Sequence, residues 1–545
     1  MAICRQCTTG FEITDRDRRF YSEMGVPEPT LCPLCRYQRR LSWRNERTLY
    51  KRKCSKTGSP IFSIYPENAP FPVFKPEVWH GDDWDPLEYG QEFDFNRPFF
   101  KQFHELQNKV PRMASILVRT ENCDYCNVIG DCKNCYLIFG SINCEDCLYG
   151  SPFNSKYCLD SLLVRNSQWC CECTDCENLY ECFHCQDCAN SQRLRFCFDL
   201  EACRDCFLCA GLRRKEYHIL NQPYSKEEYE KRINELRLKS PDKLARDLHA
   251  LKLKAPVKFM VGLNNENVTG DHVFESKNSH HLFFSEKCEE AGHSTQILDS
   301  HHVLDCDYGE MGDHIYENSG FYKSASLKFC HWCWETSDLF YCSTCGANTR
   351  NCFGCVSLKR KQYCILNKQY TREGYQALVP KIIGHMKVAG EWGQFFPMEH
   401  SPFAYNETLA QEFFPLTEKQ TDARGWRWSS RDESIPLDIK SIPAKRLPDA
   451  IKDVPDDILN WAVVCEATGR PFRITPKELQ FYRKFNLPVP HFHPDERHRL
   501  RMALRNLRVL YDRNCASCGM AIKTTYAPDR PERVLCEACY LKEVY

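Results

Sequence analysis

Cysteine spacing constrains this chain more than any other feature of its sequence. The 545 residues include 37 cysteines, and sixteen pairs of them are separated by two residues. Two sulfurs at this spacing on a tight turn can bind one metal ion, whereas a disulfide between them would strain the backbone. The N-terminal residues resemble no export signal and no apolar run is long enough to span a membrane, so we expect a cytoplasmic protein whose thiols stay reduced or bind metal.

Two quartets of cysteines have the spacing of zinc-ribbon or treble-clef knuckles. In each quartet, two Cys-x2-Cys pairs are separated by about twenty residues. The quartets are Cys4, Cys7, Cys32 and Cys35, and Cys515, Cys518, Cys536 and Cys539. Four thiolates complete a tetrahedral site and leave no position for a substrate or a reactive water. The sequence therefore predicts at least two structural Zn²⁺ ions.

The two ends of the chain are copies of one module, which align without gaps at a constant offset. Cys4 aligns with Cys465 and Cys54 with Cys515. Each copy therefore has two potential zinc positions in series, one complete and one degenerate. The degenerate positions are Cys54, Thr57, Lys75 and Val78 in the first copy, and Cys465, Thr468, His493 and Glu496 in the second. We interpret both as decayed sites; the alternative is an open catalytic zinc site that uses His493 and Glu496, or the histidines near residues 280–302.

A basic segment separates the two zinc positions of each module. At 100° per residue, its cationic side chains fall within a helical arc of about 80°. They are Arg36, Arg40, Arg44, Arg47 and Lys51 in the first copy, and Arg497, Arg501, Arg505 and Arg508 in the second. Like charges at this spacing disfavour a helix unless an anion meets them, although a solvated helix face is the simpler alternative. We predict contact with the phosphate backbone of nucleic acid.

Regional charge supports this prediction of a polyanionic partner. Residues 1–54 contain 12 basic and 6 acidic side chains, and residues 465–545 contain 15 and 9, while the whole chain is neutral. Basic ends around an acidic middle favour a polyanion at the terminal modules. Trp43 and Tyr50 beside the stripe could stack on unpaired bases, which favours RNA or the ribosome over duplex DNA; packing under the ribbon is the alternative role, above all for Tyr50.

The middle of the chain contains two cysteine arrays. Residues 123–209 hold eighteen cysteines, commonly preceded by Asn or Asp, and the second cysteine of successive pairs advances by nine to twelve residues. This interval predicts a β-solenoid with cysteines stacked inside it or at its corners. A thinner array over 257–364 begins with histidines and continues with cysteines. Both arrays end alike, because residues 212–221 match residues 358–367, and a helix is expected after each, the first with a capping box of Ser225 and Glu228.

The role of the array cysteines stays open between three alternatives. They could be core thiols, ligands of further zinc ions, or ligands of iron–sulfur clusters, although the ferredoxin spacing lacks its fourth cysteine. The candidate ligands are Cys123, Cys126, Cys132, Cys135, Cys144, Cys147, Cys182, Cys185, Cys330, Cys333, Cys342, Cys345, Cys352 and Cys355.

These features predict a multidomain protein that is mainly β with some α. The expected order is a zinc-ribbon module at 1–90, a linker at 91–115, the first array at 116–222, a helical segment at 223–256, the second array at 257–368, a helix at 369–392, a Pro- and aromatic-rich linker at 393–460 and a second module at 461–545.

Three motifs link these parts into a pattern that resembles a known family. They are Phe-Tyr-x5-Pro-x-Pro before a zinc knuckle, the array ending in Tyr-Cys-Ile-Leu-Asn-Lys-Gln-Tyr370, and Ser-Pro-Phe-Ala-Tyr-Asn406. Over nearly its whole length the chain is similar to the uncharacterised cysteine-rich zinc-ribbon proteins of candidate-phyla bacteria. The resemblance implies a cytoplasmic bacterial zinc protein and brings no established activity. Proteins of this kind sometimes carry a CoA-transferase label (CaiB/BaiF), which no residue pattern of this chain supports.

The sequence thus favours a non-enzymatic, multi-zinc binding protein that engages nucleic acid through its terminal modules, with a protein partner on the solenoids as a further option. No Walker loop, Rossmann glycine pattern, Gly-x-Ser-x-Gly or His-Glu-x-x-His motif occurs. The alternatives are an iron–sulfur electron carrier, a zinc-dependent hydrolase and a pure protein–protein scaffold.

Overall fold

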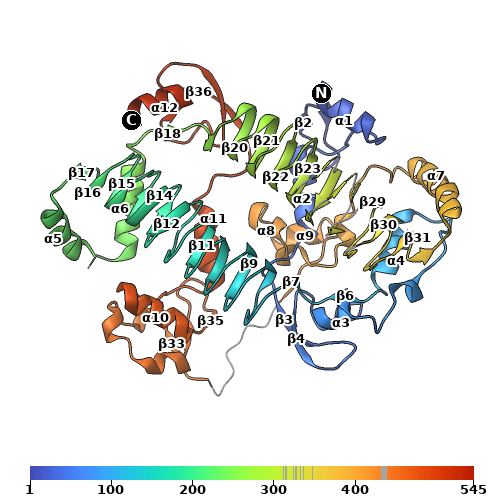
Figure 1. The fold of residues 1–545 in the computed structure, drawn as a ribbon, viewed down its shortest axis with the longest axis horizontal. Coiled ribbons are helices and arrows are strands. Elements are labelled where there is room, and N and C mark those ends of the chain that lie inside the picture. Colours follow the sequence, from blue (N-terminus) through green and yellow to red (C-terminus); the bar gives the residue numbers. More distant parts are fainter. Residues whose placement is uncertain are drawn as a thin grey trace.

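The computed structural model describes residues 1–545 apart from 238, 311, 314–315, 323, 326–327, 330, 332, 335–336, 347 and 431–438. It is mainly β, as predicted. Two β-solenoids lie side by side, and both ends of the chain pack against them (Figure 1). An ion pair between Arg165 of the first solenoid and Glu286 of the second joins the two coils directly.

The first solenoid consists of parallel strands from successive turns of one coil. Each strand pairs with residues eleven or twelve positions further on, as Leu148 does with Leu159 and Cys185 with Cys197. The last pairing is antiparallel and ends the coil. The strands are β7 (Leu117–Val118), β8 (Asn127–Gly130), β9 (Tyr136–Ile142), β10 (Leu148–Phe153), β11 (Leu159–Arg165), β12 (Glu177–Tyr180), β13 (Phe183–Gln186), β14 (Ala189–Phe198), β15 (Arg204–Ala210), β16 (Glu216–Ile219) and β17 (Gln222–Pro223).

A left-handed backbone conformation recurs at every third residue of this coil. Between residues 178 and 190 the positive φ angles fall at 178, 181, 184, 187 and 190, so a twelve-residue turn has four corners. The residue after each corner points inward, and Cys182, Cys185 and Cys188 are buried there. Asn and Asp tolerate left-handed backbone better than other residues with side chains, which explains why they so often precede Cys. Coil geometry therefore accounts for the Cys-x2-Cys spacing of the arrays.

The second solenoid repeats this architecture. Its strands are β19 (Gly262–Leu263), β20 (Glu266–Phe274), β21 (Lys277–Glu286), β22 (Gly292–Leu298), β23 (Leu304–Glu310), β24 (Gly312–Asp313), β25 (Tyr316–Ser319), β26 (Phe321–Tyr322), β27 (Ser324–Ala325), β28 (Cys333–Trp334), β29 (Ser337–Phe340), β30 (Arg350–Phe353), β31 (Gln362–Ile365) and β32 (Lys368–Gln369). Ser337 pairs with Arg350, thirteen positions on, so this turn has one extra residue. Because of this extra residue, the number of positions that separates equivalent residues of the two solenoids increases by one. It is one smaller before the insertion than after it.

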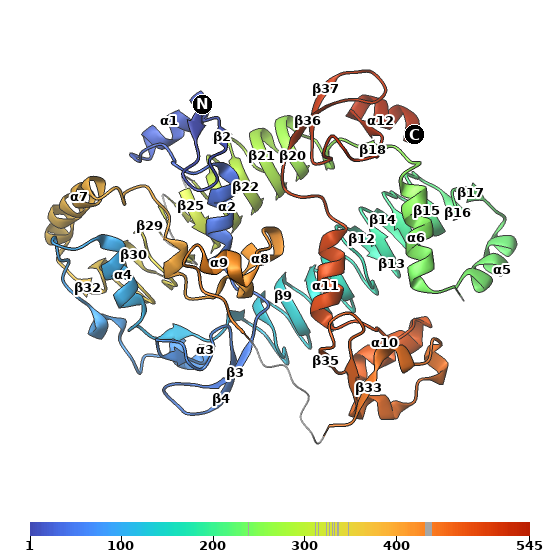
Figure 2. The same cartoon turned by 180° about the vertical axis from the view of Figure 1, so that it is seen from behind.

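The terminal modules repeat each other element by element, in the register that aligns Cys4 with Cys465. The first comprises β1 (Ala2–Ile3), β2 (Gly10–Phe11), α1 (Asp15–Glu23), α2 (Pro33–Leu41), β3 (Tyr50–Lys53), β4 (Pro60–Ser63), β5 (Val73–Phe74) and α3 (Pro76–His80). The second comprises β34 (Ala462–Val464), β35 (Pro471–Phe472), α10 (Pro476–Phe485), α11 (Pro494–Ala503), β36 (Tyr511–Asn514), β37 (Ala521–Thr524), β38 (Val534–Leu535) and α12 (Glu537–Val544). Figure 2 shows α2 and α11 at the centre of the molecule, between the two coils.

The basic segment of the first module is not one helix, contrary to our expectation. Helix α2 ends at Leu41, and Asn45 then turns the chain by donating to the carbonyls of Thr48 and Ile64. Lys51 lies on strand β3, where it is exposed. The side chain of Asn45 competes successfully for backbone partners, as Asn does in turns.

The remaining elements connect these parts. Helix α5 (Lys226–Leu236) begins with the predicted capping box of Ser225 and Glu228. The others are η1 (Pro86–Tyr89), α4 (Phe99–Gln107), β6 (Arg112–Met113), α6 (Pro241–Lys252), β18 (Val257–Lys258), α7 (Arg372–Val388), η2 (Met398–His400), η3 (Tyr405–Glu407), α8 (Leu409–Phe413), α9 (Glu418–Asp422), β33 (Ser441–Pro443), η4 (Ala444–Arg446), η5 (Ile451–Asp453) and η6 (Asp456–Asn460). Among the described residues, no helix combines the length and the apolar character that crossing a bilayer requires.

Candidate metal centres

The N-terminal cysteine quartet converges on one point. The β1–β2 hairpin supplies Cys4 and Cys7, and the start of α2 supplies Cys32 and Cys35; the four sulfurs lie within 4.8 Å of one another. Cys7 Sγ and Cys32 Sγ are 3.7 Å apart. Four thiolates at about 2.3 Å from a central ion would be separated by about 3.8 Å, whereas disulfide sulfurs are about 2.0 Å apart. The geometry therefore fits a tetrahedral metal ion.

The electrostatics of this quartet favour thiolates at Cys4, Cys7 and Cys32, whereas the hydrogen bond with Cys32 raises the pKa of Cys35. Cys32 is the N-cap of α2, where the helix dipole stabilises negative charge. A hydrogen bond from Cys35, acting against burial, lowers the pKa of the Cys32 thiol to about 6. Hydrogen bonds from the backbone of Cys32 and Cys7 outweigh burial and lower the pKa of Cys4.

The C-terminal quartet has the same construction from the second half of its module. The β36–β37 hairpin supplies Cys515 and Cys518, and Cys536 is the N-cap of α12, with Cys539 in its first turn. Cys518 Sγ and Cys536 Sγ are also 3.7 Å apart. Burial raises the pKa of Cys515, but hydrogen bonds from the backbone of Cys518 and Cys536 outweigh it and lower this pKa to about 6. Both strong quartets are therefore brought together as the sequence predicted.

The degenerate quartet of the second module makes other contacts. Both carboxylate oxygens of Glu496 accept from Arg499. His493 is the N-cap of α11, and its Nδ1 accepts from the backbone N–H of Asp495 at 3.1 Å. Among the described residues, no convergent group of ligand atoms includes Cys465, His493 or Glu496. Burial lowers the pKa of His493 to about 4 despite the nearby carboxylate of Asp495.

The degenerate quartet of the first module is likewise used for ordinary packing. Cys54 is buried, and Thr57 shares a 2.8 Å hydrogen bond with Ser59. Lys75 is the N-cap of α3, where it makes no side-chain capping bond, and Val78 packs against a core cluster.

Apart from Cys171, the array cysteines whose side chains the structure describes lie in or against the cores of the solenoids. Within the described part of the chain, no three of them bring their sulfurs within 4.8 Å of one another. Their thiols donate to backbone carbonyls, as Cys185 does to Phe183 at 3.4 Å and Cys197 to Cys206 at 3.6 Å. Burial raises the pKa of the Cys288 thiol to about 12. Of the predicted ligands, Cys330 lies outside the described residues and Cys333 is described by its backbone alone.

The arginine stripe of the first module is buried against the second solenoid, not exposed as the sequence suggested. Arg36 is 2% and Arg40 1% exposed. Arg36 Nε lies 2.9 Å from Asp305 Oδ2, and Arg40 Nη1 lies 3.2 Å from Asp305 Oδ1. Arg40 also pairs with Asp307, and Arg39 with Glu317 at 2.6 Å. Carboxylates of the same chain supply the anions that we had assigned to nucleic acid.

The later cations of the first stripe are also in contact with the protein. Arg44 pairs with Glu46 and lies 3.9 Å from the centre of the Tyr308 ring. Arg47 lies 3.4 Å from Asp495 of the other module.

The arginine stripe of the second module is buried against the first solenoid in the same way. Asp160 forms ion pairs with both Arg497 and Arg501, the latter at 3.0 Å. Arg501 also pairs with Glu172 at 2.9 Å. Arg505 pairs with Asp175 at 2.9 Å, and Arg508 donates to the hydroxyl of Tyr37. Each module therefore docks on the solenoid that is more distant from it in sequence.

The aromatic residues beside the first stripe are not available to bases. Trp43 is 0% exposed and packs against Phe396, with ring centres 5.0 Å apart. The Tyr50 hydroxyl donates to Glu407 and lies 3.2 Å from the Ser429 hydroxyl. The stacking role is therefore replaced by packing for both residues.

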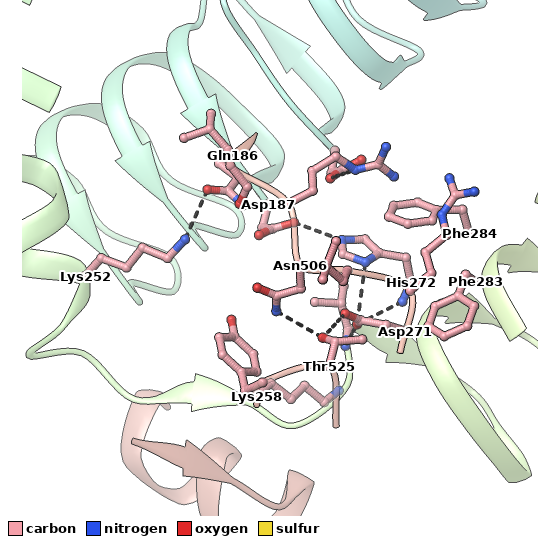
Figure 3. Close-up of a pocket in the computed structure, with 17 residues that line it drawn as sticks. Gln186, Asp187, Lys252, Lys258, Asp271, His272, Phe283, Phe284, Asn506 and Thr525 are labelled. Atoms are coloured by element: carbon pink, nitrogen blue, oxygen red, sulfur yellow. Dashed lines mark hydrogen bonds and ion pairs between the residues drawn. The ribbon is translucent and has the colours of Figure 1, made fainter. Parts of the chain in front are cut away.

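A small pocket lies where the two solenoids, α6 and the second module meet (Figure 3). His272 Nε2 is 2.9 Å from Asp187, and Thr525 donates to Asp271 at 2.8 Å. Burial lowers the pKa of His272, but the carboxylates of Asp271 and Asp187 outweigh it and raise this pKa to about 9. His272, Asp175 and Asp187 bring their ligand atoms within 4.8 Å of one another. Arg505 pairs with Asp175, so this group already holds a cation beside its carboxylates.

Sequence reasoning missed the carboxylates that receive the arginines. Asp160 and Asp305 are corner residues with φ angles of 47° and 55°, so they resemble every other Asp before an inward-facing residue. Their recurrence at equivalent positions of the two solenoids, together with two similar arginine stripes, was the available signal.

Comparison with known proteins adds little to this geometry. No protein-family model and no curated protein matches the chain. Among solved structures, it is similar to a protein from Desulfovibrio desulfuricans G20 that is provisionally assigned as an acetyltransferase. The two are 9% identical, with 40% of this chain and 66% of that chain covered, which is just under two thirds of its length, and the TM-score is 0.11. A score this low carries no argument about fold or function.

Proposed function

We propose that this protein is a non-enzymatic scaffold in which zinc folds the two terminal modules and the modules brace the pair of solenoids. One observation carries the proposal: both cysteine quartets lie in the modules whose buried arginines join α2 and α11 to the solenoids. Removing one partner of a buried ion pair costs about 3–5 kcal/mol, so each module is committed to its docked position. The outer faces of the braced coils are the surface that we assign to a protein partner.

Zinc is the metal that suits these sites best. Closed four-cysteine sites on hairpin-and-helix knuckles are typical structural zinc sites. Each module is small and has its own short hairpins, so metal binding would supply much of its folding free energy. A closed site of four thiolates also leaves no coordination position for a substrate, which supports a structural role.

The test is to count metal ions and to measure the consequence of losing each one. We expect about one zinc fewer for Cys32→Ser and for Cys536→Ser, with increased hydrogen exchange in the affected module and along the solenoid that it covers. Cys54→Ser is a matched control, because Cys54 is the counterpart of Cys515 in a degenerate quartet. Unchanged metal content in Cys32→Ser, or charge-transfer absorption of iron–sulfur clusters in the purified protein, would contradict the proposal.

A nucleic-acid partner stays a prediction. The arginines that we predicted to bind its phosphates are largely buried and paired within the protein. Seven of their eight guanidinium groups already form ion pairs with carboxylates of this chain, and the eighth, that of Arg508, donates to Tyr37, so phosphate would have to displace these contacts. The scaffold proposal therefore does not include nucleic acid.

A further inference from the structure

Three histidines of the second solenoid converge beside one carboxylate of the N-terminal module. His280 and His281 lie on β21, His293 lies one turn later on β22, and their ring nitrogens are within 4.8 Å of one another. Asp17, in the first turn of α1, faces His280 and His293. Its Oδ1 lies 3.3 Å from His280 Nε2, and its Oδ2 lies 3.9 Å from His293 Nε2.

Each of the four residues has, within the described part of the chain, one buried side-chain atom without a hydrogen-bond partner. These atoms are His280 Nε2, His281 Nδ1, His293 Nδ1 and Asp17 Oδ1. Asp17 is 2% exposed, and its other oxygen, Oδ2, accepts from the backbone N–H of Thr14 as part of the helix cap. Of the four unpaired atoms, Asp17 Oδ1 and His280 Nε2 face each other. Leaving both unpaired is costly, and a cation bound between them would satisfy both.

The chemistry of the donors suits a divalent transition-metal ion. Ligands at about 2.0–2.1 Å from a tetrahedral ion are about 3.3 Å apart, which matches the separation of Asp17 Oδ1 and His280 Nε2. A neutral imidazole offers one nitrogen lone pair to a metal ion, and among the described residues His281 Nδ1 and His293 Nδ1 have no hydrogen-bond partner. Imidazole nitrogens with one carboxylate are a ligand set that zinc and its neighbours in the first transition series accept.

The backbone beneath the cluster has no room for a side chain. An added Cβ at Gly292 would lie 2.5 Å from His280 Cε1 and 2.8 Å from His280 Nε2. Glycine at this position therefore allows the imidazole of His280 to lie flat over the next turn of the coil. The φ angle of Gly292 is not in the left-handed region, so glycine is needed here to leave room for the ring and not to permit an unusual backbone conformation.

The other module provides an internal comparison. Glu478 occupies the position of Asp17 in α10 and caps Thr475 in the same way. Its carboxylate is satisfied by the hydroxyls of Tyr149 and Tyr482, each at 2.9 Å. The equivalent acid of the first module faces imidazoles instead. Both modules therefore have an acidic residue at this position, but among the described residues histidines face only the one in the first module.

We propose that His280, His281, His293 and Asp17 form a third metal site, for Zn²⁺ or a similar divalent transition-metal ion, which fastens helix α1 to the second solenoid. With three imidazoles and one carboxylate as ligands the site is closed, so its role is to hold the module in place. It adds a sulfur-free site to the two cysteine quartets and can fail without affecting them.

The test is metal stoichiometry and cobalt spectroscopy on the full-length protein. We expect about three zinc ions per chain at saturation, and about two in His281→Ala/His293→Ala. After cobalt substitution, the ion lost in this variant is expected to contribute ligand-field bands without thiolate-to-cobalt charge transfer. His301→Ala is the matched control, because His301 lies on the same solenoid, is exposed and pairs with Glu289; it should keep three ions.

Two milder variants keep the test decisive if the double alanine variant does not fold. Asp17→Asn retains an oxygen to cap Thr14 but loses the charge, and Gly292→Ala displaces the ring of His280. Each should weaken zinc binding at the third site at least about tenfold while both cysteine sites stay loaded. Two zinc ions in the wild-type protein at saturation, or a third ion that survives Asp17→Asn and Gly292→Ala with unchanged affinity, would overturn the proposal. A protein that binds zinc at the histidines but not at the two cysteine quartets would instead contradict the proposed scaffold function.

Discussion

Asp160 and Asp305 occupy equivalent positions in the two solenoids, and each anchors the helix of a terminal module through buried ion pairs. Each is a corner residue, and each forms ion pairs with two arginines spaced four positions apart on one helix: Arg497 and Arg501 for Asp160, and Arg36 and Arg40 for Asp305. The helices belong to opposite ends of the chain. Two equivalent sets of buried ion pairs, which we call seams, therefore hold the molecule together. Each seam joins a terminal module to the solenoid that is more distant from it in sequence.

Replacing Asp305 by Ala leaves two buried guanidinium groups without their shared carboxylate. We expect this to destabilise the protein by about 3–5 kcal/mol and to release α2 from the second solenoid, as measured by urea denaturation and hydrogen exchange. Asp160→Ala should have the same effect on α11. Glu216→Ala, which breaks an exposed pair with Arg204, is the control and should leave the urea midpoint unchanged. Equal effects of the buried and exposed changes would argue against the seams.

Charge reversal at the arginines tests the nucleic-acid hypothesis. Arg40→Glu or Arg501→Glu would place a third carboxylate beside buried acids, so we expect loss of folding and not a selective loss of polyanion binding. Lys51→Glu, at the exposed end of the same stripe, should fold normally. If Arg40→Glu instead folds like the parent protein and only its RNA affinity falls, as measured by binding at several salt concentrations, the arginines contact nucleic acid after all.

The array cysteines are expected to stabilise the coil by packing. Cys185→Ala and Cys197→Ala should each cost about 1 kcal/mol through the small cavity left in a close-packed core. Metal content, measured by elemental analysis, should not change. A drop of about one metal ion in either variant would show that the array binds metal.

Stability should fall with rising pH because of His272. Its pKa in the folded protein is raised to about 9, above the value of about 6.5 expected when unfolded, so the protonated form stabilises the fold. The contribution is complete below about pH 6.5 and is lost as the pH rises toward about 9. Urea midpoints measured across this range should therefore decline.

A His272→Gln variant should lack this part of the pH dependence. The groups that face His272 are Asp175, Asp187, Asp271 and Arg505. A parallel decline in the variant and the parent protein would assign the pH dependence to another group.

The sequence by itself determined the elements that depend on local spacing. The regular interval between cysteine pairs, with Asn or Asp before Cys, predicted a solenoid, because a coil with four corners needs left-handed residues at fixed positions. The paired Cys-x2-Cys motifs predicted the two quartets, since ligands three positions apart on a turn are already close. The gapless alignment of the two ends of the chain predicted two similar modules.

Only the tertiary structure decided what meets the arginines. A helical stripe of like charges favours a nearby anion, but Arg36 and Asp305 are far apart in the sequence, and no local rule indicates that the anion belongs to the same chain. The left-handed corner conformation already explains why Asp occurs at 160 and 305. Nothing local in the sequence therefore indicates that these carboxylates also pair with arginines. The convergence of His280, His281 and His293 on Asp17 depends likewise on how a module docks on a solenoid, because contacts of this kind are set by packing between distant segments.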